Sequence, residues 1–145
     1  MGATRREAQP NDTLPPGVAE GYRLQPGEAM VVESRPSPFQ VVFEDDGETA
    51  YLYVMDHRRG PEQPIIDALH IYNAADERDG DPMDLQIVWT TDAQAAALLL
   101  DGVAVAMADF AAPRFMCRSE FPPPGAEAPV DTHAWDQAAF DARFS

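Results

Sequence analysis

The stretch VVFEDDGETAYLYVMD, residues 41–56, alternates apolar and polar side chains on both sides of a short acidic segment. Alternation with a period of two residues is typical of half-buried antiparallel strands. Asp46 and Gly47 form the dipeptide that favours a tight type I′ hairpin turn, because both turn positions need a positive φ. The sequence therefore predicts two strands, residues 39–44 and 49–55, joined at Asp46 and Gly47.

This register sets Phe43 opposite Ala50 and collects the apolar side chains of both strands on one face. Four acidic residues surround the predicted turn: Glu44, Asp45, Asp46 and Glu48. They allow two interpretations, a carboxylate cluster for a metal or for catalysis, and a well-formed turn. Since alternation points the four carboxylates to different sides of the ribbon, we favour the turn, with Glu44 and Glu48 as solubilising residues at the strand ends.

A second hairpin is predicted in AAALLLDGVAVAMADF, residues 95–110, around Asp101 and Gly102. A strand over residues 85–90 precedes it as a neighbour. A regular pairing separates a bulky face from a face that consists mainly of alanine, which predicts that another element packs closely on the small side. The bulky face contains Leu98, Leu100, Val103, Val105 and Met107.

Two further segments complete the predicted fold. Residues 64–73, PIIDALHIYN, fit both a helical stripe and a strand, and we predict a turn followed by a strand. Residues 131–144 predict a helix that Asp131 or Thr132 caps. The fold class is α+β, an antiparallel β-meander of about six or seven strands with a C-terminal helix.

The domain organisation follows from composition. Residues 1–26 are rich in proline, and their charges cancel, so we predict a flexible arm before a single compact domain over residues 27–145. Cys117 is the sole cysteine, which excludes an intramolecular disulfide. Neither a secretory signal nor a run of about 20 apolar residues is evident, so we expect a cytoplasmic location.

The charge is strongly one-sided. The chain has 25 acidic residues against 10 basic ones, all arginine, for a net charge of -15. Such a surface repels nucleic acid and anionic membranes, because phosphate groups are bound by clustered cations. It attracts basic proteins and accelerates their encounter. We therefore predict a basic protein partner.

The acidic loop of residues 76–84 is the best candidate for a metal site, since hard cations prefer several oxygen ligands. Its carboxylates are Asp76, Asp79, Asp81 and Asp84. The spacing does not match the calcium-binding loop of an EF-hand, because Arg78 occupies a ligand position and no glutamate ends the loop. A solvated surface loop is the preferred interpretation, and we predict neither a metal nor a cofactor.

The histidine with the most polar surroundings is His70, which the strand pattern places on one face with Tyr72, near Asp67. A carboxylate can orient a histidine as a general base. A histidine with a purely structural hydrogen bond in the sheet is the alternative. The sequence contains no phosphate-binding glycine loop and no GxSxG nucleophile motif.

Several segments together resemble an uncharacterised bacterial domain family: FEDDGET, DALHIYN, DGVAVAMADF and FPPP. The resemblance covers most of residues 28–140. It implies one compact bacterial domain and transfers no catalytic residue.

Two functional classes remain. The first is a non-enzymatic acidic protein-binding domain, for example an immunity protein that neutralises a basic toxin. Its predicted contact residues are Tyr51, Tyr53, Glu44, Glu48, Asp76, Asp79 and Asp81. The alternative is a small metal-binding protein or a hydrolase-like enzyme that uses His70 and the carboxylates of the 76–84 loop.

Overall fold

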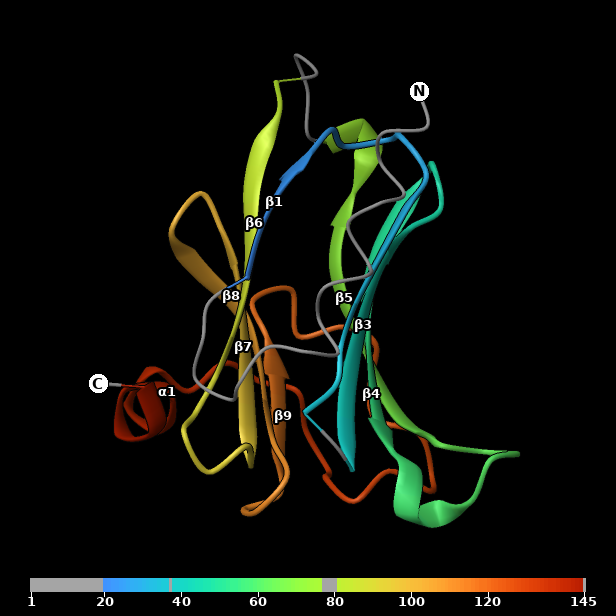
Figure 1. Cartoon of the computed structure of the whole chain (residues 1–145), viewed down its shortest axis with the longest axis vertical. Helices are drawn as coiled ribbons and strands as arrows, with labels where there is room; N and C mark the ends of the chain where they lie inside the picture. Colours follow the sequence, from blue (N-terminus) through green and yellow to red (C-terminus); the bar gives the residue numbers. More distant parts are fainter. Residues whose placement is uncertain (1–19, 37, 77–80, 145) are drawn as a thin grey trace.

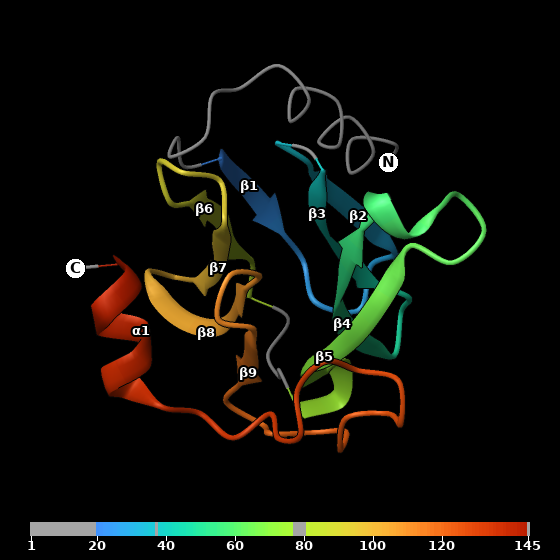
Figure 2. The ribbon, with the colours of Figure 1, turned by 90° about the horizontal axis from the view of Figure 1, so that it is seen from below.

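The computed structural model describes residues 20–36, 38–76 and 81–144. Two antiparallel sheets face each other, and a short helix follows at the C-terminal end (Figures 1 and 2). The strands are β1 (Glu20–Leu24), β2 (Met30–Ser34), β3 (Phe39–Asp45), β4 (Thr49–Asp56), β5 (Ile65–Asn73), β6 (Met83–Trp89), β7 (Ala95–Leu100), β8 (Val103–Asp109) and β9 (Arg114–Cys117). The helical elements are η3 (His57–Arg59), η4 (Ala74–Asp76) and α1 (Gln137–Phe144).

The five-stranded sheet has the order β1-β6-β7-β8-β9, and the four-stranded sheet has the order β2-β3-β4-β5. The chain passes from one sheet to the other after β1 and again after β5. The predicted α+β class, the antiparallel pairing and the C-terminal helix are confirmed. The predicted strand number is too low, since β1 and β9 were missed. The predicted meander is also divided between two sheets.

The predicted arm ends too late in the sequence. Its residues Glu20–Leu24 form β1, which pairs with β6 in an antiparallel register. Leu24 is fully buried in the core, and Arg23 forms an ion pair with Asp84 at 2.7 Å. Five residues between prolines carry little local signal, because this strand is stabilised by a partner far away in the sequence. The rest of the predicted arm, residues 1–19, lies outside the described residues.

The β3–β4 hairpin has the predicted faces and a different register. Phe43 pairs with Leu52, two residues beyond the predicted partner. The N–H of Asp46 donates to the carbonyl oxygen of Thr49 at 3.1 Å, so the turn residues are Gly47 and Glu48, and Gly47 has a φ of 103°. The Asp46 carboxylate accepts hydrogen bonds from the N–H groups of Glu48 and Thr49. A shift of two residues preserves the apolar face, so the alternation alone could not distinguish the two registers.

The β7–β8 turn agrees with the predicted type I′ geometry, because Asp101 and Gly102 have φ values of 50° and 81°. Beyond the turn, a bulge opposite Leu98 and Leu99 leaves Val105 without a partner in the register. The bulge reverses the faces, so the predicted separation of a bulky face from an alanine face is wrong. Leu98 packs in the core on the same face as alanines from both strands.

The core fills the space between the sheets and is crossed by a buried hydrogen bond. Nε1 of Trp89 on β6 donates to Oγ of Ser34 on β2 at 2.8 Å. At the same end of the sandwich, the ring of Phe110 stacks on Phe39 with centroids 4.2 Å apart. These contacts connect the two sheets directly.

A segment that we name the strap, residues 118–135, closes the side of the sandwich where β5 and β9 lie (Figure 2). The N–H of His70 on β5 donates to the carbonyl oxygen of Phe121, and the N–H of Cys117 on β9 donates to that of His133. The helix begins only after the strap, where Asp136 accepts a hydrogen bond from the N–H of Ala139. The predicted caps, Asp131 and Thr132, are therefore wrong, because the strap continues in an extended form through this region.

Candidate functional site

Four ring side chains form a continuous row on the outer face of the four-stranded sheet. Their order is Tyr53 and Tyr51 on β4, His70 on β5 and Phe121 on the strap. Successive ring centroids are 6.1, 5.5 and 5.9 Å apart. Phe121 is 51% exposed, and the other three rings are half-buried. We name this feature the aromatic row. It contains both predicted tyrosines, whereas Phe121 was missed because only the strap brings it to β5.

A bulge in β5 directly after His70 leaves His70 on this face and turns Tyr72 to the other. Tyr72 pairs with Ala50, and His70 pairs with Tyr51, so Ile71 is an extra residue between the two pairs. Tyr72 consequently points inward, where it is 5% exposed and its hydroxyl donates to Oδ2 of Asp45 at 2.6 Å. The prediction that His70 and Tyr72 share one face is wrong, because strict alternation does not hold across a bulge.

The His70 ring is held on both sides. Nδ1 lies 3.0 Å from Oγ of Ser119, and Nε2 lies 3.0 Å from Oδ1 of Asn73. Nδ2 of Asn73 donates in turn to Oδ2 of Asp76 at 3.3 Å. Oγ of Ser119 also lies 3.0 Å from the carbonyl oxygen of His70. These contacts fix the orientation of the ring within the aromatic row.

Asp67, predicted to lie near His70, points into the interior instead. Its Oδ2 lies 2.7 Å from Nε2 of His133, and both side chains are nearly inaccessible, at 4% and 0% exposed. Nδ1 of His133 lies 2.6 Å from the carbonyl oxygen of Pro122. This pair connects β5 to the strap.

Acidic side chains lie beside the aromatic row. Glu44 on β3 pairs directly with Tyr51, and Glu48 is exposed in the β3–β4 turn. The carbonyl oxygen of Glu48 accepts a hydrogen bond from the N–H of Ala74 at 2.8 Å, which brings the turn beside the end of β5. Burial raises the pKa of the Tyr53 hydroxyl, and the Glu44 carboxylate adds to the effect, so this phenol stays protonated at neutral pH.

The other predicted acidic contact residues differ in position. Asp76 lies at this end of the sheet through its hydrogen bond with Asn73, and Asp81 is exposed at the start of the segment that leads into β6. Asp79 lies outside the described residues. Within the described ranges, no three His, Cys, Asp or Glu side chains lie close enough together to hold a metal ion.

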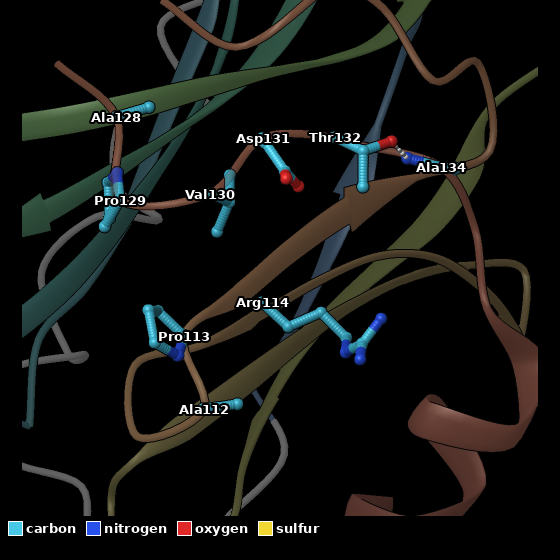
Figure 3. Close-up of a pocket in the computed structure, with 9 residues that line it drawn as sticks. All are labelled: Ala112, Pro113, Arg114, Ala128, Pro129, Val130, Asp131, Thr132 and Ala134. Carbon is cyan, nitrogen blue, oxygen red and sulfur yellow. Dashed lines mark hydrogen bonds between the residues drawn. The ribbon is translucent and has the colours of Figure 1, made fainter. Parts of the chain in front are cut away.

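A hollow in the surface lies between the β8–β9 turn and the strap (Figure 3). Arg114 extends along it and lies 3.5 Å from Asp136 in an ion pair, whereas Asp131 faces it from the strap. Its other lining residues are Ala112, Pro113, Ala128, Pro129, Val130, Thr132 and Ala134. Because a guanidinium already occupies part of this hollow, it is poorly suited to a cationic ligand.

Comparison with known proteins identifies relatives without assigning an activity. A model of the family described as "Uncharacterized protein conserved in bacteria (DUF2251)" matches residues 24–144. The chain belongs to this family. The predicted resemblance to an uncharacterised bacterial family is thereby confirmed, and the matched range begins within β1.

One relative is an "Uncharacterized protein" from Haemophilus influenzae, 43% identical over 74 residues. The aligned part covers 50% of this chain and 45% of the relative, so the chain spans less than half of that protein's length. No solved structure matches the chain. In the part of the chain that the structure describes, no helix has the length and apolar character needed to cross a membrane.

Proposed function

We propose that this chain is a non-enzymatic protein-binding domain whose aromatic row receives a cationic protein partner. The aromatic row itself is the observation that carries this proposal. Partly exposed tyrosine and phenylalanine rings are typical anchors of protein interfaces, since they bury a large area at a small cost in side-chain entropy. Three elements hold the rings at fixed spacing, so little order has to be created on binding.

The charge of the chain supports the choice of a cationic partner. Glu44 lies beside Tyr51, Glu48 lies near the same end of the sheet, and the whole chain has a net charge of -15. Complementary charge accelerates the encounter and disfavours acidic competitors. An immunity protein that neutralises a basic toxin is one functional class with these properties.

Affinity capture tests this function. The chain is immobilised and exposed to an extract of a bacterium that contains the family, and retained proteins are identified by mass spectrometry. We expect basic proteins whose retention decreases strongly in Tyr51→Ala and Phe121→Ala. Val103→Ala is the matched control, since Val103 is an exposed apolar residue of the other sheet. Retention of acidic proteins, or equal retention by all variants, would contradict the proposal.

A second candidate function, a small hydrolase, is favoured by one observation. Ser119, His70, Asn73 and Asp76 form a chain of contacts from a hydroxyl through an imidazole and an amide to a carboxylate. A hydroxyl beside an imidazole base is the arrangement of an activated nucleophile. However, the Ser119 hydroxyl is also within hydrogen-bonding distance of the His70 carbonyl oxygen, which ties it to the backbone of β5.

An esterase assay distinguishes the two functions. If the chain is a hydrolase, it cleaves p-nitrophenyl acetate faster than free imidazole at the same concentration, and Ser119→Ala abolishes the difference. For the protein-binding function we expect neither the purified chain nor Ser119→Ala to exceed the rate of free imidazole.

A further inference from the structure

A second hollow lies at the upper end of the four-stranded sheet in Figure 1, where the β1–β2 loop, the β3–β4 turn and the end of β5 meet. We name it the end hollow. Its lining residues are Pro26, Gly27, Gly47, Glu48, Thr49, Asn73, Ala74 and Ala75. It adjoins the aromatic row through Asn73, whose side chain contacts the His70 ring.

Hydrogen bonds to the buried residue Asp45 hold the end hollow in shape. The Asp45 carboxylate accepts from the N–H of Gly27 at 2.9 Å and from the N–H of Gly47 at 2.8 Å, and the Tyr72 hydroxyl donates to it as well. Gly27 has a φ of 92°, and a Cβ there would lie 3.6 Å from Cβ of Ala74. The loop, the turn and the strand end are thus fixed relative to one another before any ligand binds.

The lining combines an apolar wall with oxygen acceptors. Pro26, Ala74 and Ala75 supply the apolar part, whereas Glu48 supplies a carboxylate and Thr49 a hydroxyl. Among the residues that the structure describes, the lining contains no arginine and no histidine, in contrast to the hollow that contains Arg114. A long basic side chain matches such a lining, since its stem is aliphatic and only its head carries charge.

We propose that the end hollow accepts an arginine or lysine side chain of the cationic partner. The stem lies along the wall of Pro26 and Ala74, and the charged head meets the Glu48 carboxylate. The neighbouring residues of the partner then cover His70 and Tyr51 in the aromatic row. This inference rests on the proposed function and names the side chain that the partner contributes.

Fluorescence anisotropy with labelled octa-arginine tests the end hollow, with labelled octa-lysine in parallel. Glu48→Gln removes the carboxylate, and Ala75→Trp fills the hollow without a change of charge. We expect each of these two variants to weaken the binding of one or both peptides roughly tenfold. A loss of this size corresponds to the free energy of one charge-assisted hydrogen bond. Glu127→Gln on the strap is the matched control, since it removes an exposed carboxylate away from the hollow. We expect it to change affinity less than about twofold.

Equal losses in Glu48→Gln and Glu127→Gln would overturn the proposal, because they would show a general effect of net charge. Full binding by Ala75→Trp would overturn it as well, as would failure of the unaltered chain to bind either peptide. The thermal midpoint of each variant shows whether it is folded. If Tyr51→Ala loses binding while both hollow variants retain it, the end hollow is excluded and the aromatic row stands. The proposed function is judged separately, by the retention of basic proteins from the extract.

Discussion

At the scale of single residues, Asp45 differs most from its sequence neighbours. In the acidic segment it is one of four carboxylates around a glycine, and alternation places it on the apolar face with Phe43. In the fold it is 1% exposed and accepts hydrogen bonds from Gly27, Gly47 and Tyr72. Asp46, by contrast, is exposed and caps its own turn. The burial of the Asp45 carboxylate therefore depends on three segments that meet around it.

Replacing Asp45 by asparagine should lower the free energy of unfolding by about 1–3 kcal/mol, the cost of leaving a buried donor unsatisfied. An amide keeps the shape of the carboxylate but has only one oxygen, so one N–H group loses its acceptor. Asp46→Asn should change stability by less than about 0.5 kcal/mol, since asparagine is a good turn residue and the site is exposed. Urea unfolding monitored by tryptophan fluorescence measures both. If the two variants changed the free energy of unfolding equally, the hydrogen bonds of the buried Asp45 carboxylate would contribute little to stability.

At the scale of elements, the strap is anchored by a buried side-chain contact as well as by backbone hydrogen bonds. Nδ1 of His133 faces the Pro122 carbonyl oxygen, which only accepts hydrogen bonds, so Nδ1 carries a proton. A hydrogen bond between Nε2 and Asp67 then needs a further proton, on the ring or on the carboxyl group. The contact anchors the strap to β5 beside the segment that presents Phe121 to the aromatic row.

His133→Ala should therefore destabilise the fold by roughly 3–5 kcal/mol, because it leaves the Asp67 carboxylate buried without its partner. The double variant Asp67→Asn with His133→Ala should be more stable than His133→Ala alone, since it buries no unpaired charge. Denaturant titration of the single and double variants gives the coupling energy. Simple additivity of the two changes would show that the contact is energetically unimportant.

The first strand provides a second test at this scale. A chain that begins at residue 27 lacks β1, and with it the buried Leu24 and the partner of β6. We expect a clear fall in the thermal midpoint. Leu24→Ala in the full chain should cost about 2–5 kcal/mol, as is usual for a large side chain removed from a core. An unchanged midpoint in the shortened chain would mean that β1 adds nothing to the five-stranded sheet.

At the scale of the whole molecule, the proposed function implies that charge controls how a partner arrives, whereas the aromatic row controls how long it stays. The net charge of -15 acts over the distance at which salt leaves electrostatic forces unscreened. The rings of the aromatic row act only on contact. The two contributions therefore belong to different kinetic constants.

For a basic partner recovered by affinity capture, the association rate should fall markedly between about 0.05 and 0.5 M salt, as the Debye length shortens from above 10 Å to a few ångströms. The dissociation rate should change much less with salt and should rise in Phe121→Ala. Surface plasmon resonance at several salt concentrations separates the two rates. An association rate independent of salt would contradict the proposed role of the acidic surface.

The sequence by itself determined the features that depend on neighbouring residues. Alternation and the Asp-Gly dipeptides located β3, β4, β7 and β8, together with the turn at Asp101 and Gly102, because hairpins are built from local contacts. The same alternation places Tyr51 and Tyr53 on the face of β4 opposite the apolar one. The sequence therefore identified these two rings of the candidate site. It did not show that they form one row with His70 and Phe121.

Only the tertiary structure decided which strands share a sheet and which rings share a row. The pairing of β1 with β6 and the contact of Phe121 with His70 join segments far apart in the chain, for which no local pattern exists. The bulge at Ile71 turned Tyr72 inward and left His70 on the outer face, although strict alternation places both on one face. A bulge adds one residue to one strand, so where it forms depends on how both faces pack against their neighbours, and that information is absent from the strand itself.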